Sequence, residues 1–286
     1  LMRILRGLPV TVTGLATLLV INIAQTASLT LMPFSKRAFR RFNRWCAATW
    51  WGLCVIAAER FNGTRVVVSG EDVPPHENAL LVANHQNMPD ITALMAYARS
   101  KRRLGDLKFF VKHAIKWVPG IGWGMQFLSC PFLKRDWDRD SERVRRTFES
   151  LVNESIPMWL VTFAEGTRAT PEKIRASAEW ALGRGLEATR HVQLPRTKGF
   201  VATVDGLGDH LHAIYDITIA YVDGVPTLWE YITGSVRQIH LHVRRFPVDR
   251  LPRVDNELKQ WLYDRFREKD ELLEHFYRYG RFPAEA

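Results

Sequence analysis

Cysteine is scarce in this sequence of 286 residues, which contains only Cys46, Cys54 and Cys130. These three form no C-x-x-C pair and their number is odd, which argues against a disulfide framework. Two of them lie in an apolar segment, and a free cysteine usually behaves as a small buried residue. We therefore expect reduced cysteines in the core or facing lipid, and a reducing compartment on the side of the folded domain.

Other familiar patterns are also absent. The sequence has no G-x-S-x-G stretch, which excludes a nucleophile elbow, and no lysine and glycine spacing of a P-loop. It has no internal repeat, no low-complexity tract and no second long apolar segment after the first sixty residues. The organisation that we predict is a membrane-anchoring helical segment over residues 1–62 and one α/β domain over residues 63–286.

The charge is positive. Forty Lys and Arg residues face thirty Asp and Glu residues, a formal net charge of +10 that favours nucleic acid, lipid headgroups or phosphorylated substrates as partners. Ten tryptophans and fifteen phenylalanines accompany this charge, a combination common at membrane interfaces. A nucleic-acid binder should show a basic stripe with aromatic stacking positions, and no such module is visible.

The N-terminal region carries the longest uncharged stretch, over residues 7–35. About twenty apolar residues suffice to cross the hydrocarbon core of a bilayer. A basic run, SKRAFRRFNR, follows instead of a signal-peptide cleavage site. This excess of positive charge predicts that the region after Lys36 lies on the cytoplasmic side.

A second uncharged segment, WCAATWWGLCVIAA at residues 45–58, is too short to span a bilayer comfortably. It predicts an interfacial or re-entrant helix. Because both flanks of the first segment are basic, a full span and a helical hairpin dipping into one leaflet both remain open. A buried core helix is the third alternative.

The remainder alternates short β-branched runs with helical periods, the pattern of an α/β domain. We expect a mixed sheet flanked by helices, behind the membrane-associated two-helix segment at the N-terminus. The predicted strands are TRVVVSG, ALLVAN, KFFVK, CPFLK, WLVTF, YDITIAY and RQIHLHVRRF. The predicted helices are ITALMAYARS, ERVRRTFESLV, PEKIRASAEWALGRG and the C-terminal VDNELKQWLYDRFREKDELLEHFYR.

The stretch NHQNMPD places His85 at the end of the apolar run ALLVAN and Asp90 five positions later. Since Pro89 opens a helix, we expect His85 on a strand-to-helix loop and Asp90 in the first helical turn. The carboxylate can then hold one imidazole nitrogen and leave the other free as a general base. A capping aspartate beside a surface histidine would give the same spacing.

The stretch FAEGTR follows another predicted strand, WLVTF. This loop suits the binding of an oxyanion, because it carries an acid, a glycine, a hydroxyl and an arginine. Gly166 would allow the backbone to approach closely, the Thr167 hydroxyl would donate a hydrogen bond, and Arg168 would bind a phosphate through two parallel donors. A salt-bridged structural turn is the alternative.

Two further stretches carry cations. FLKR contains Lys134 and Arg135, which could hold a phosphate or line a solvated edge, and PRTKGF adds Lys198 before a possible helix. His240 and His242 fall on one face of a predicted strand, but this pair lacks a third ligand, so we predict no metal site.

In this order, NH-x4-D, FLKR-x-W-x-x-D, F-x-EGTR, PRTKGF and YDITIAY resemble the blocks of the lysophospholipid and glycerophospholipid acyltransferases, the PlsC superfamily. The resemblance runs from about residue 10 to residue 277. Its FLKR block is similar to that of the subgroup acting on lysophosphatidic acid, lysophosphatidylinositol and lysocardiolipin, and of bacterial YihG-like relatives. Animal members of that subgroup carry a C-terminal hydrophobic span that is absent here, which favours a bacterial inner-membrane protein.

The resemblance implies a glycerol-3-phosphate acyltransferase-like fold and acyl transfer from acyl-CoA or acyl-carrier protein, without a cofactor, to a lysophospholipid hydroxyl. His85 is then the base, oriented by Asp90, and a backbone N–H near the His85 loop is the expected oxyanion donor. The acceptor phosphate is expected on Lys134, Arg135, Gly166, Thr167, Arg168 and Lys198, with Glu165 bonding the glycerol hydroxyls or positioning Arg168. Acceptors with inositol, glycerol or lysocardiolipin headgroups, and a non-catalytic protein that binds anionic lipid, are the alternatives.

Overall fold

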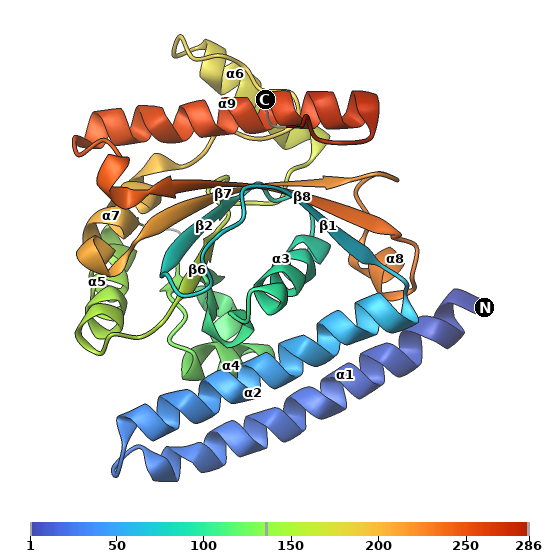
Figure 1. Cartoon of the computed structure of the whole chain (residues 1–286), viewed down its shortest axis with the longest axis vertical. Helices are drawn as coiled ribbons and strands as arrows, with labels where there is room; N and C mark the ends of the chain where they lie inside the picture. The colour runs from blue at the N-terminus through green and yellow to red at the C-terminus, as the bar shows by residue number, and fades with distance from the viewer. Residues whose placement is uncertain (1, 135–136, 285–286) are drawn as a thin grey trace.

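A six-stranded mixed sheet runs through the centre of the protein (Figure 1). The structure is a computed structural model and describes residues 2–134 and 137–284. The strand order is β1-β8-β7-β2-β6-β3, with β7, β2, β6 and β3 mutually parallel and β8 antiparallel to β7. The strands are β1 (Arg65–Gly70), β2 (Ala79–Ala83), β3 (Leu107–Phe109), β6 (Trp159–Thr162), β7 (Ala213–Tyr221) and β8 (Gln238–Pro247). A two-stranded sheet pairs β4 (Val111–Lys112) with β5 (Phe132–Leu133). The predicted α/β class is confirmed.

Helices cover both faces of the sheet (Figure 1). The longer helices are α1 (Met2–Ala27), α2 (Lys36–Ile56), α3 (Pro89–Ser100), α5 (Trp137–Asn153), α6 (Pro171–Leu182), α7 (Thr197–Leu207) and α9 (Asp255–Tyr279). The short ones are α4 (Ile121–Phe127), α8 (Leu228–Ile232), the 3-10 turns η1 (Ser28–Leu31), η3 (Leu104–Asp106), η4 (His113–Trp117), η5 (Gly208–His210) and η6 (Val248–Arg250), and the π turn η2 (Ala57–Phe61).

Strand periodicity divides the core into two layers. Along β7, Tyr215, Ile217 and Ile219 pack into the layer under α3 and α2, while Ile214 packs into the layer under α5, α7 and α9. This follows from the alternation of side chains across a strand. Tyr221, the last residue of β7, therefore lies on the α3 side.

The long helix α9 is fastened to the sheet by a buried ion pair. Lys269 falls within the apolar stripe of α9 and is completely buried, and its Nζ lies 2.5 Å from Asp216 Oδ1 and donates to the Ile217 carbonyl at 2.7 Å. Arg244, opposite Asp216 on β8, lies 2.5 Å from the other carboxylate oxygen. Burial lowers the pKa of Lys269 to about 8, against the opposing effect of the Asp216 carboxylate.

The N-terminal helices form an antiparallel hairpin, with α2 packed on the domain and α1 outside it (Figure 1). Helix α2 begins at Lys36, because the Ser35 side chain caps the Ala38 amide. The basic run thus forms the first turns of α2, and the prediction of a short separate helix at residues 45–58 was wrong in its start. Within the described chain, one helix, Gly7–Leu31, is long and apolar enough to cross a membrane. Only 17% of its most apolar 18-residue stretch is buried in the protein.

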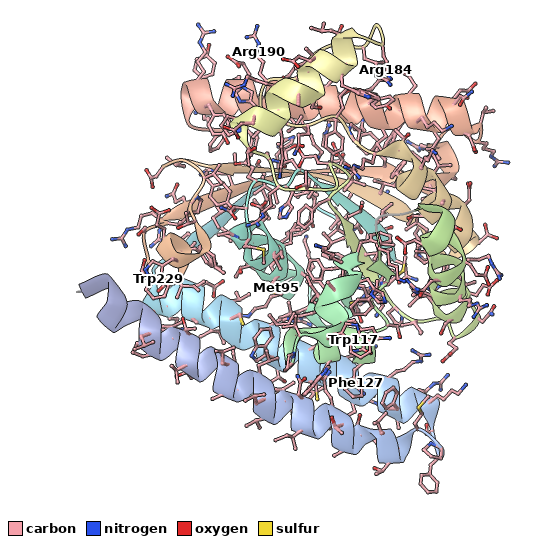
Figure 2. All side chains as sticks on the ribbon, turned by 180° about the vertical axis from the view of Figure 1, so that it is seen from behind. Met95, Trp117, Phe127, Arg184, Arg190 and Trp229 are labelled. Carbon is pink, nitrogen blue, oxygen red and sulfur yellow. The ribbon has the colours of Figure 1, made fainter. Side chains whose placement is uncertain are left out.

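Two other differences from the predicted elements have local causes. The run KFFVK breaks at Phe110, because β3 pairs with β6 whereas β4 turns away to pair with β5. Helix α4 was not predicted, since Gly122 and Gly124 lower its helix propensity. Figure 2 shows where this region lies, with Trp117 and Phe127 beside the hairpin.

Candidate active site

The predicted motifs meet at one edge of the sheet because the strands before them are parallel. His85 follows β2, and Phe163–Arg168 follows the neighbouring strand β6. Strand β7, on the other side of β2, ends at Tyr221 on the same edge. In α/β sheets of this kind, the carboxyl ends of parallel strands are where binding sites form.

His85 and Asp90 are in hydrogen-bond contact. Nδ1 of His85 lies 2.9 Å from Oδ2 of Asp90, which sits in the first turn of α3 and is completely buried. The His85 side chain is 13% exposed, and its Nε2 has no hydrogen-bond partner among the residues that the structure describes. The ring therefore has one nitrogen held by a carboxylate and the other available to a substrate.

Asp90 also accepts three other hydrogen bonds. The backbone amides of Gln86 and Asn87 donate to Oδ2 at 2.7 and 3.0 Å, and the hydroxyl of Tyr221 donates to Oδ1 at 2.5 Å. Burial and the neighbouring Asp90 carboxylate raise the pKa of Tyr221, so this hydroxyl keeps the proton that it donates. Sequence reasoning did not identify Tyr221, although it closes the strand YDITIAY on the face that α3 covers.

Side-chain amides fix the loop that carries His85. The Asn84 side chain exchanges hydrogen bonds with the backbone of Ile219 on β7, at 3.1 and 2.8 Å, just past the end of β2. Gln86 donates to the same Ile219 carbonyl at 2.7 Å, and Asn87 donates to the Pro226 carbonyl at 2.8 Å. The loop is therefore bound on both sides of the histidine, which preorganises the ring.

Phe163 and Glu165 support His85 from the β6 side. The Phe163 ring stacks on the imidazole with centroids 4.0 Å apart and planes 19° apart. The two carboxyl oxygens of Glu165 accept from the backbone amides of His85 at 2.7 Å and Gln193 at 3.0 Å. Burial raises the pKa of Glu165 to about 8, and the two amides oppose this shift.

These contacts change the interpretation of Glu165. The Glu165 side chain is buried, and both of its oxygens accept hydrogen bonds from backbone amides. Arg168 is exposed, so Glu165 and Arg168 form no ion pair. The turn at Gly166, where φ is +75°, separates them. Glu165 thus ties the His85 loop to the segment before α7.

Arg168 reaches the His85 loop from the outside. Its Nη1 donates to Oδ1 of Asn87 at 3.2 Å. Thr167 is held by Lys173, whose Nζ donates to the threonine hydroxyl at 2.8 Å. A guanidinium group therefore stands at the rim of the loop that carries the imidazole.

Arg196 is a second cation at this loop. Its backbone amide donates to the Ala164 carbonyl at 2.7 Å, and a Cβ at Gly166 would lie 2.8 Å from its Nε. Gly166 therefore leaves space for this guanidinium group, which is exposed. Arg196 lies in the stretch PRTKGF, of which only Lys198 was predicted to bind the acceptor.

The other predicted cations are not joined to this loop by any contact within the described chain. Lys134 is exposed after β5, and Lys198 is exposed in the first turn of α7. Arg135 lies outside the described residues. His240 and His242 pack against Phe276 and Phe282, and the part of the chain that the structure describes holds no group of three potential metal ligands.

The expected oxyanion donor is not found in the His85 loop. The backbone amide of His85 donates to Glu165, those of Gln86 and Asn87 donate to Asp90, and that of Met88 donates to Oδ1 of Asn87 at 2.9 Å. Each of these four donors already has an acceptor. An oxyanion formed beside His85 needs a donor from another segment.

Two family models match this chain. The acyltransferase model matches residues 65–222, and the acyltransferase C-terminus model matches residues 230–286. The first contains the His85 loop and the loop from Phe163 to Arg168.

Curated relatives cover nearly the whole chain. A protein named probable 1-acyl-sn-glycerol-3-phosphate acyltransferase 5 of Arabidopsis thaliana is 31% identical over 100% of this chain and 77% of its own length. The human 1-acyl-sn-glycerol-3-phosphate acyltransferase gamma is 33% identical, over 93% of this chain and 72% of its own. Lysocardiolipin acyltransferase 1 of Danio rerio is 35% identical, over 87% of this chain and 65% of its own.

A solved structure shares the fold. The crystal structure of the 1-acyl-sn-glycerophosphate (LPA) acyltransferase PlsC from Thermotoga maritima superposes with a TM-score of 0.58 at 18% identity, covering 94% of this chain and 97% of that one. The acyltransferase model spans more than half of this chain, and the relatives exceed 30% identity over most of it. The protein therefore belongs to the PlsC-like acyltransferase family, as the order of its motifs predicted.

Proposed function

We propose that the protein transfers a fatty acyl group from an acyl-CoA or acyl-carrier-protein thioester to the free hydroxyl of 1-acyl-glycerol-3-phosphate. The observation that carries this proposal is the His85–Asp90 pair, whose loop also contacts Arg168 through Asn87. A base and a phosphate-binding group then stand on the same loop. The relatives named as 1-acyl-sn-glycerol-3-phosphate acyltransferases support this choice of acceptor.

In this mechanism Nε2 of His85 takes the proton of the acceptor hydroxyl while its oxygen attacks the thioester carbonyl. The tetrahedral intermediate then collapses, the carbon–sulfur bond breaks, and the departing thiolate recovers the proton from the imidazolium. Asp90 stabilises the charged ring in between. Since a thioester is already activated, the reaction needs no acyl-enzyme, and general-base catalysis alone is typically worth about 10² to 10⁴ in rate.

The acceptor phosphate would lie against Arg168 and Arg196, on the two sides of Gly166. The roles of Thr167, Lys134, Lys198 and Arg135 stay predictions, since no contact that the structure describes joins the two lysines to this loop and Arg135 lies outside the described residues. A guanidinium group offers two parallel donors to a phosphate. Glu165 acts here as a positioning residue for the loop and does not contact the substrate.

Arg168→Ala is expected to raise KM for the phosphorylated acceptor by about 10- to 150-fold, the range given by losing a charge-assisted hydrogen bond of about 1.5 to 3 kcal/mol. KM for the acyl donor should change little, because the arginine is proposed to contact only the acceptor. Steady-state kinetics with each substrate varied in turn measures both values. Arg175→Ala, an exposed arginine on α6, is the control. An equal loss toward both substrates would reject the phosphate role.

Tyr221→Phe is expected to lower the rate about tenfold, equivalent to about 1.4 kcal/mol, because Asp90 loses one of its donors. The loss should appear in kcat, with KM for both substrates unchanged, because Tyr221 contacts Asp90 and is not proposed to contact a substrate. Tyr215→Phe is the matched control, since Tyr215 lies on the same strand, is buried, and donates to Glu77 instead. An unchanged kcat in Tyr221→Phe would show that Tyr221 only packs.

The acceptor headgroup is tested directly. The purified protein is supplied with acyl-CoA or acyl-carrier protein and with one lysolipid at a time: lysophosphatidate, lysophosphatidylinositol, lysophosphatidylglycerol or monolysocardiolipin. Phosphatidate is the expected product. The relative named lysocardiolipin acyltransferase favours a larger headgroup as the second candidate. Turnover confined to that lysolipid would overturn the assignment of the acceptor.

We also propose that residues 1–62 attach the catalytic domain, residues 63–286, to the cytoplasmic side of a membrane, with a bacterial inner membrane as the predicted location. The exposed apolar surface of α1 and the basic first turns of α2 support attachment to an anionic leaflet. The lysolipid acceptor would then reach the site from the leaflet while its acyl chain stays in hydrocarbon.

A further inference from the structure

Residues 113–127, in the crossover between β4 and β5, form an unusually apolar exposed tip. Trp117 is 72% exposed, and Val118, Ile121 and Trp123 are each 44% exposed. Single exposed apolar residues are ordinary, but four within seven positions form a patch of the kind that marks an interaction surface. The catalytic mechanism proposed above makes no use of these residues.

Backbone hydrogen bonds hold the tip in a fixed conformation. The Val118 amide donates to the Ile115 carbonyl at 2.9 Å, and the Gly122 amide donates to the Val118 carbonyl at 3.0 Å. A Cβ on Gly122 would lie 2.0 Å from the Ile115 oxygen, so α4 packs directly on the preceding turn. Trp117 and Val118 are therefore held outward in a fixed turn, and little conformational entropy remains to be lost on binding.

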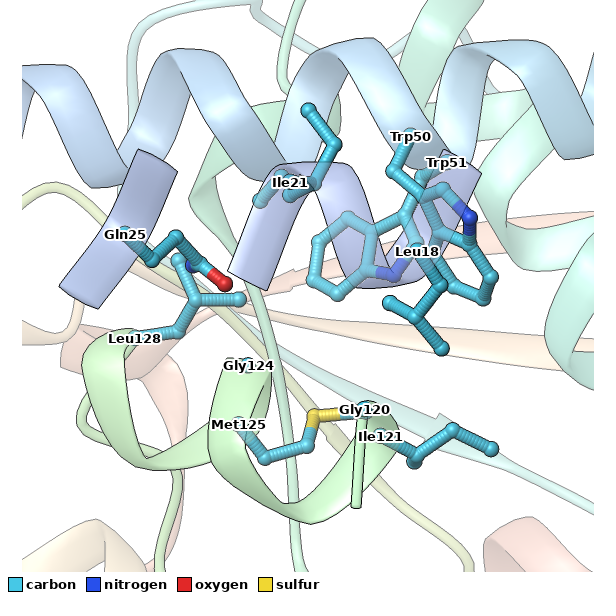
Figure 3. Close-up of a pocket in the computed structure, with 11 residues that line it drawn as sticks. Leu18, Ile21, Gln25, Trp50, Trp51, Gly120, Ile121, Gly124, Met125 and Leu128 are labelled. Carbon is cyan, nitrogen blue, oxygen red and sulfur yellow. The ribbon is translucent and has the colours of Figure 1, made fainter. Parts of the chain in front are cut away.

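The tip continues the apolar surface of α1. Gly120 lies so close to Leu18 that a Cβ there would stand 2.8 Å from the leucine Cδ2. Ile121 lines a small apolar cavity together with Leu18 and Ile21 (Figure 3). On α1, Leu19 beside Leu18 is 51% exposed. One apolar surface thus extends from the helix that is long enough to span a membrane to the 113–127 tip.

Cations lie beside this segment. Nζ of Lys116 lies 5.6 Å from the centre of the Trp117 ring. The pKa of His113 is lowered by partial desolvation and by the positive charges of Arg143, Lys134 and Lys116 nearby. Tryptophan beside lysine and arginine suits the headgroup region of an anionic bilayer, where the rings lie at the interface and the cations meet lipid phosphates.

We propose that the 113–127 tip is a second membrane contact, which places Trp117 and its apolar neighbours at headgroup depth in an anionic bilayer beside the hairpin. The proposal rests on the membrane-bound function proposed above. Two contacts from separate parts of the chain prevent the domain from rocking about the hairpin. The tip would thus orient the catalytic edge relative to the lysolipid in the leaflet.

Tryptophan quenching by brominated lipid locates the tip. The full-length protein is mixed with vesicles of phosphatidylcholine and phosphatidylglycerol that carry bromine on the upper acyl chain. Trp117→Phe is expected to lower the quenchable part of the fluorescence. Trp180→Phe is the matched control, because Trp180 is also exposed, at 43%, and its ring lies under Arg184. Arg184 lies at the end of the molecule opposite Trp117 (Figure 2). Trp45→Phe, from an exposed position on α2, reports on the hairpin.

The outcomes separate this proposal from the function on which it rests. Lower quenching in Trp117→Phe than in Trp180→Phe supports the second contact. Unchanged quenching in Trp117→Phe, with a loss in Trp45→Phe, overturns the second contact and leaves attachment through the hairpin. Absence of quenching in every protein overturns membrane attachment at both sites.

An activity measurement adds a second arm. Trp117→Ser combined with Trp123→Ser is expected to lower turnover of vesicle-embedded lysophosphatidate about tenfold. Turnover of a short-chain, water-soluble lysophosphatidate should be unchanged, because neither tryptophan belongs to the catalytic site. Equal losses with both acceptors would show damage to the site or to the fold and would overturn the interfacial role.

Discussion

His85→Ala is expected to lower the rate of acyl transfer by about 10² to 10⁴, the usual contribution of a positioned general base. The loss should fall on kcat, because the imidazole acts on the reacting hydroxyl, whereas the phosphate is proposed to be held by separate cations. The variant should still fold, since Asp90 keeps the Gln86 and Asn87 amides and the Tyr221 hydroxyl as donors. Initial rates of phosphatidate formation and thermal unfolding of the same preparation measure both results.

His76→Ala is the matched control for this variant, because His76 is exposed on the loop before β2. It should keep wild-type turnover. If purified His85→Ala protein retains near wild-type turnover, His85 is not the base and the mechanism is wrong.

Asp90→Asn is the second large effect, and it separates charge from geometry. An asparagine at this site can turn its amide oxygen toward His85 and the two backbone amides, and its amide nitrogen toward the Tyr221 hydroxyl, which then serves as acceptor. The fold should therefore survive with little change in unfolding temperature. The rate should fall by about 10²-fold or more, because no carboxylate remains to stabilise the imidazolium that forms during transfer.

Asp90→Ala removes the geometry as well as the charge. It leaves the Gln86 and Asn87 amides without their buried acceptor, at a cost of about 1 to 3 kcal/mol for each unsatisfied group. We therefore expect lower unfolding temperature in Asp90→Ala but not in Asp90→Asn, with activity lost in both. Full activity in Asp90→Asn would show that the carboxylate only holds the loop.

Local pattern was sufficient for most of the secondary structure. The run YDITIAY lies within β7 (Ala213–Tyr221), and the predicted C-terminal helix differs from α9 (Asp255–Tyr279) by one residue at each end. Both carry a strong period over many residues. The predicted start of the second helix was wrong because the uncharged run begins at Trp45, whereas α2 already begins in the basic run, at Lys36 after the cap Ser35.

Distant partners could not be predicted. Tyr221 donates to Asp90 across 131 positions of sequence, and Glu165 accepts from His85 across 80. Neither a tyrosine at the end of a strand nor a glutamate in an oxyanion-binding motif has a neighbouring residue that indicates which distant group it will hydrogen-bond. Arg196 likewise acquires its place beside Gly166 only when the segment before α7 returns to the end of β6.

The order and spacing of the motifs were enough to specify the family, the α/β class and the proximity of His85 to Asp90, because these depend on residues near one another along the chain. Only the tertiary structure decided the rest. It places Glu165 against backbone amides, lets the Tyr221 hydroxyl donate to the Asp90 carboxylate, and gives the amides of the His85 loop acceptors within the protein. It also packs the 113–127 tip against α1. The physical reason is that each buried donor or acceptor must find a partner, and the packing of the sheet determines which groups come within reach.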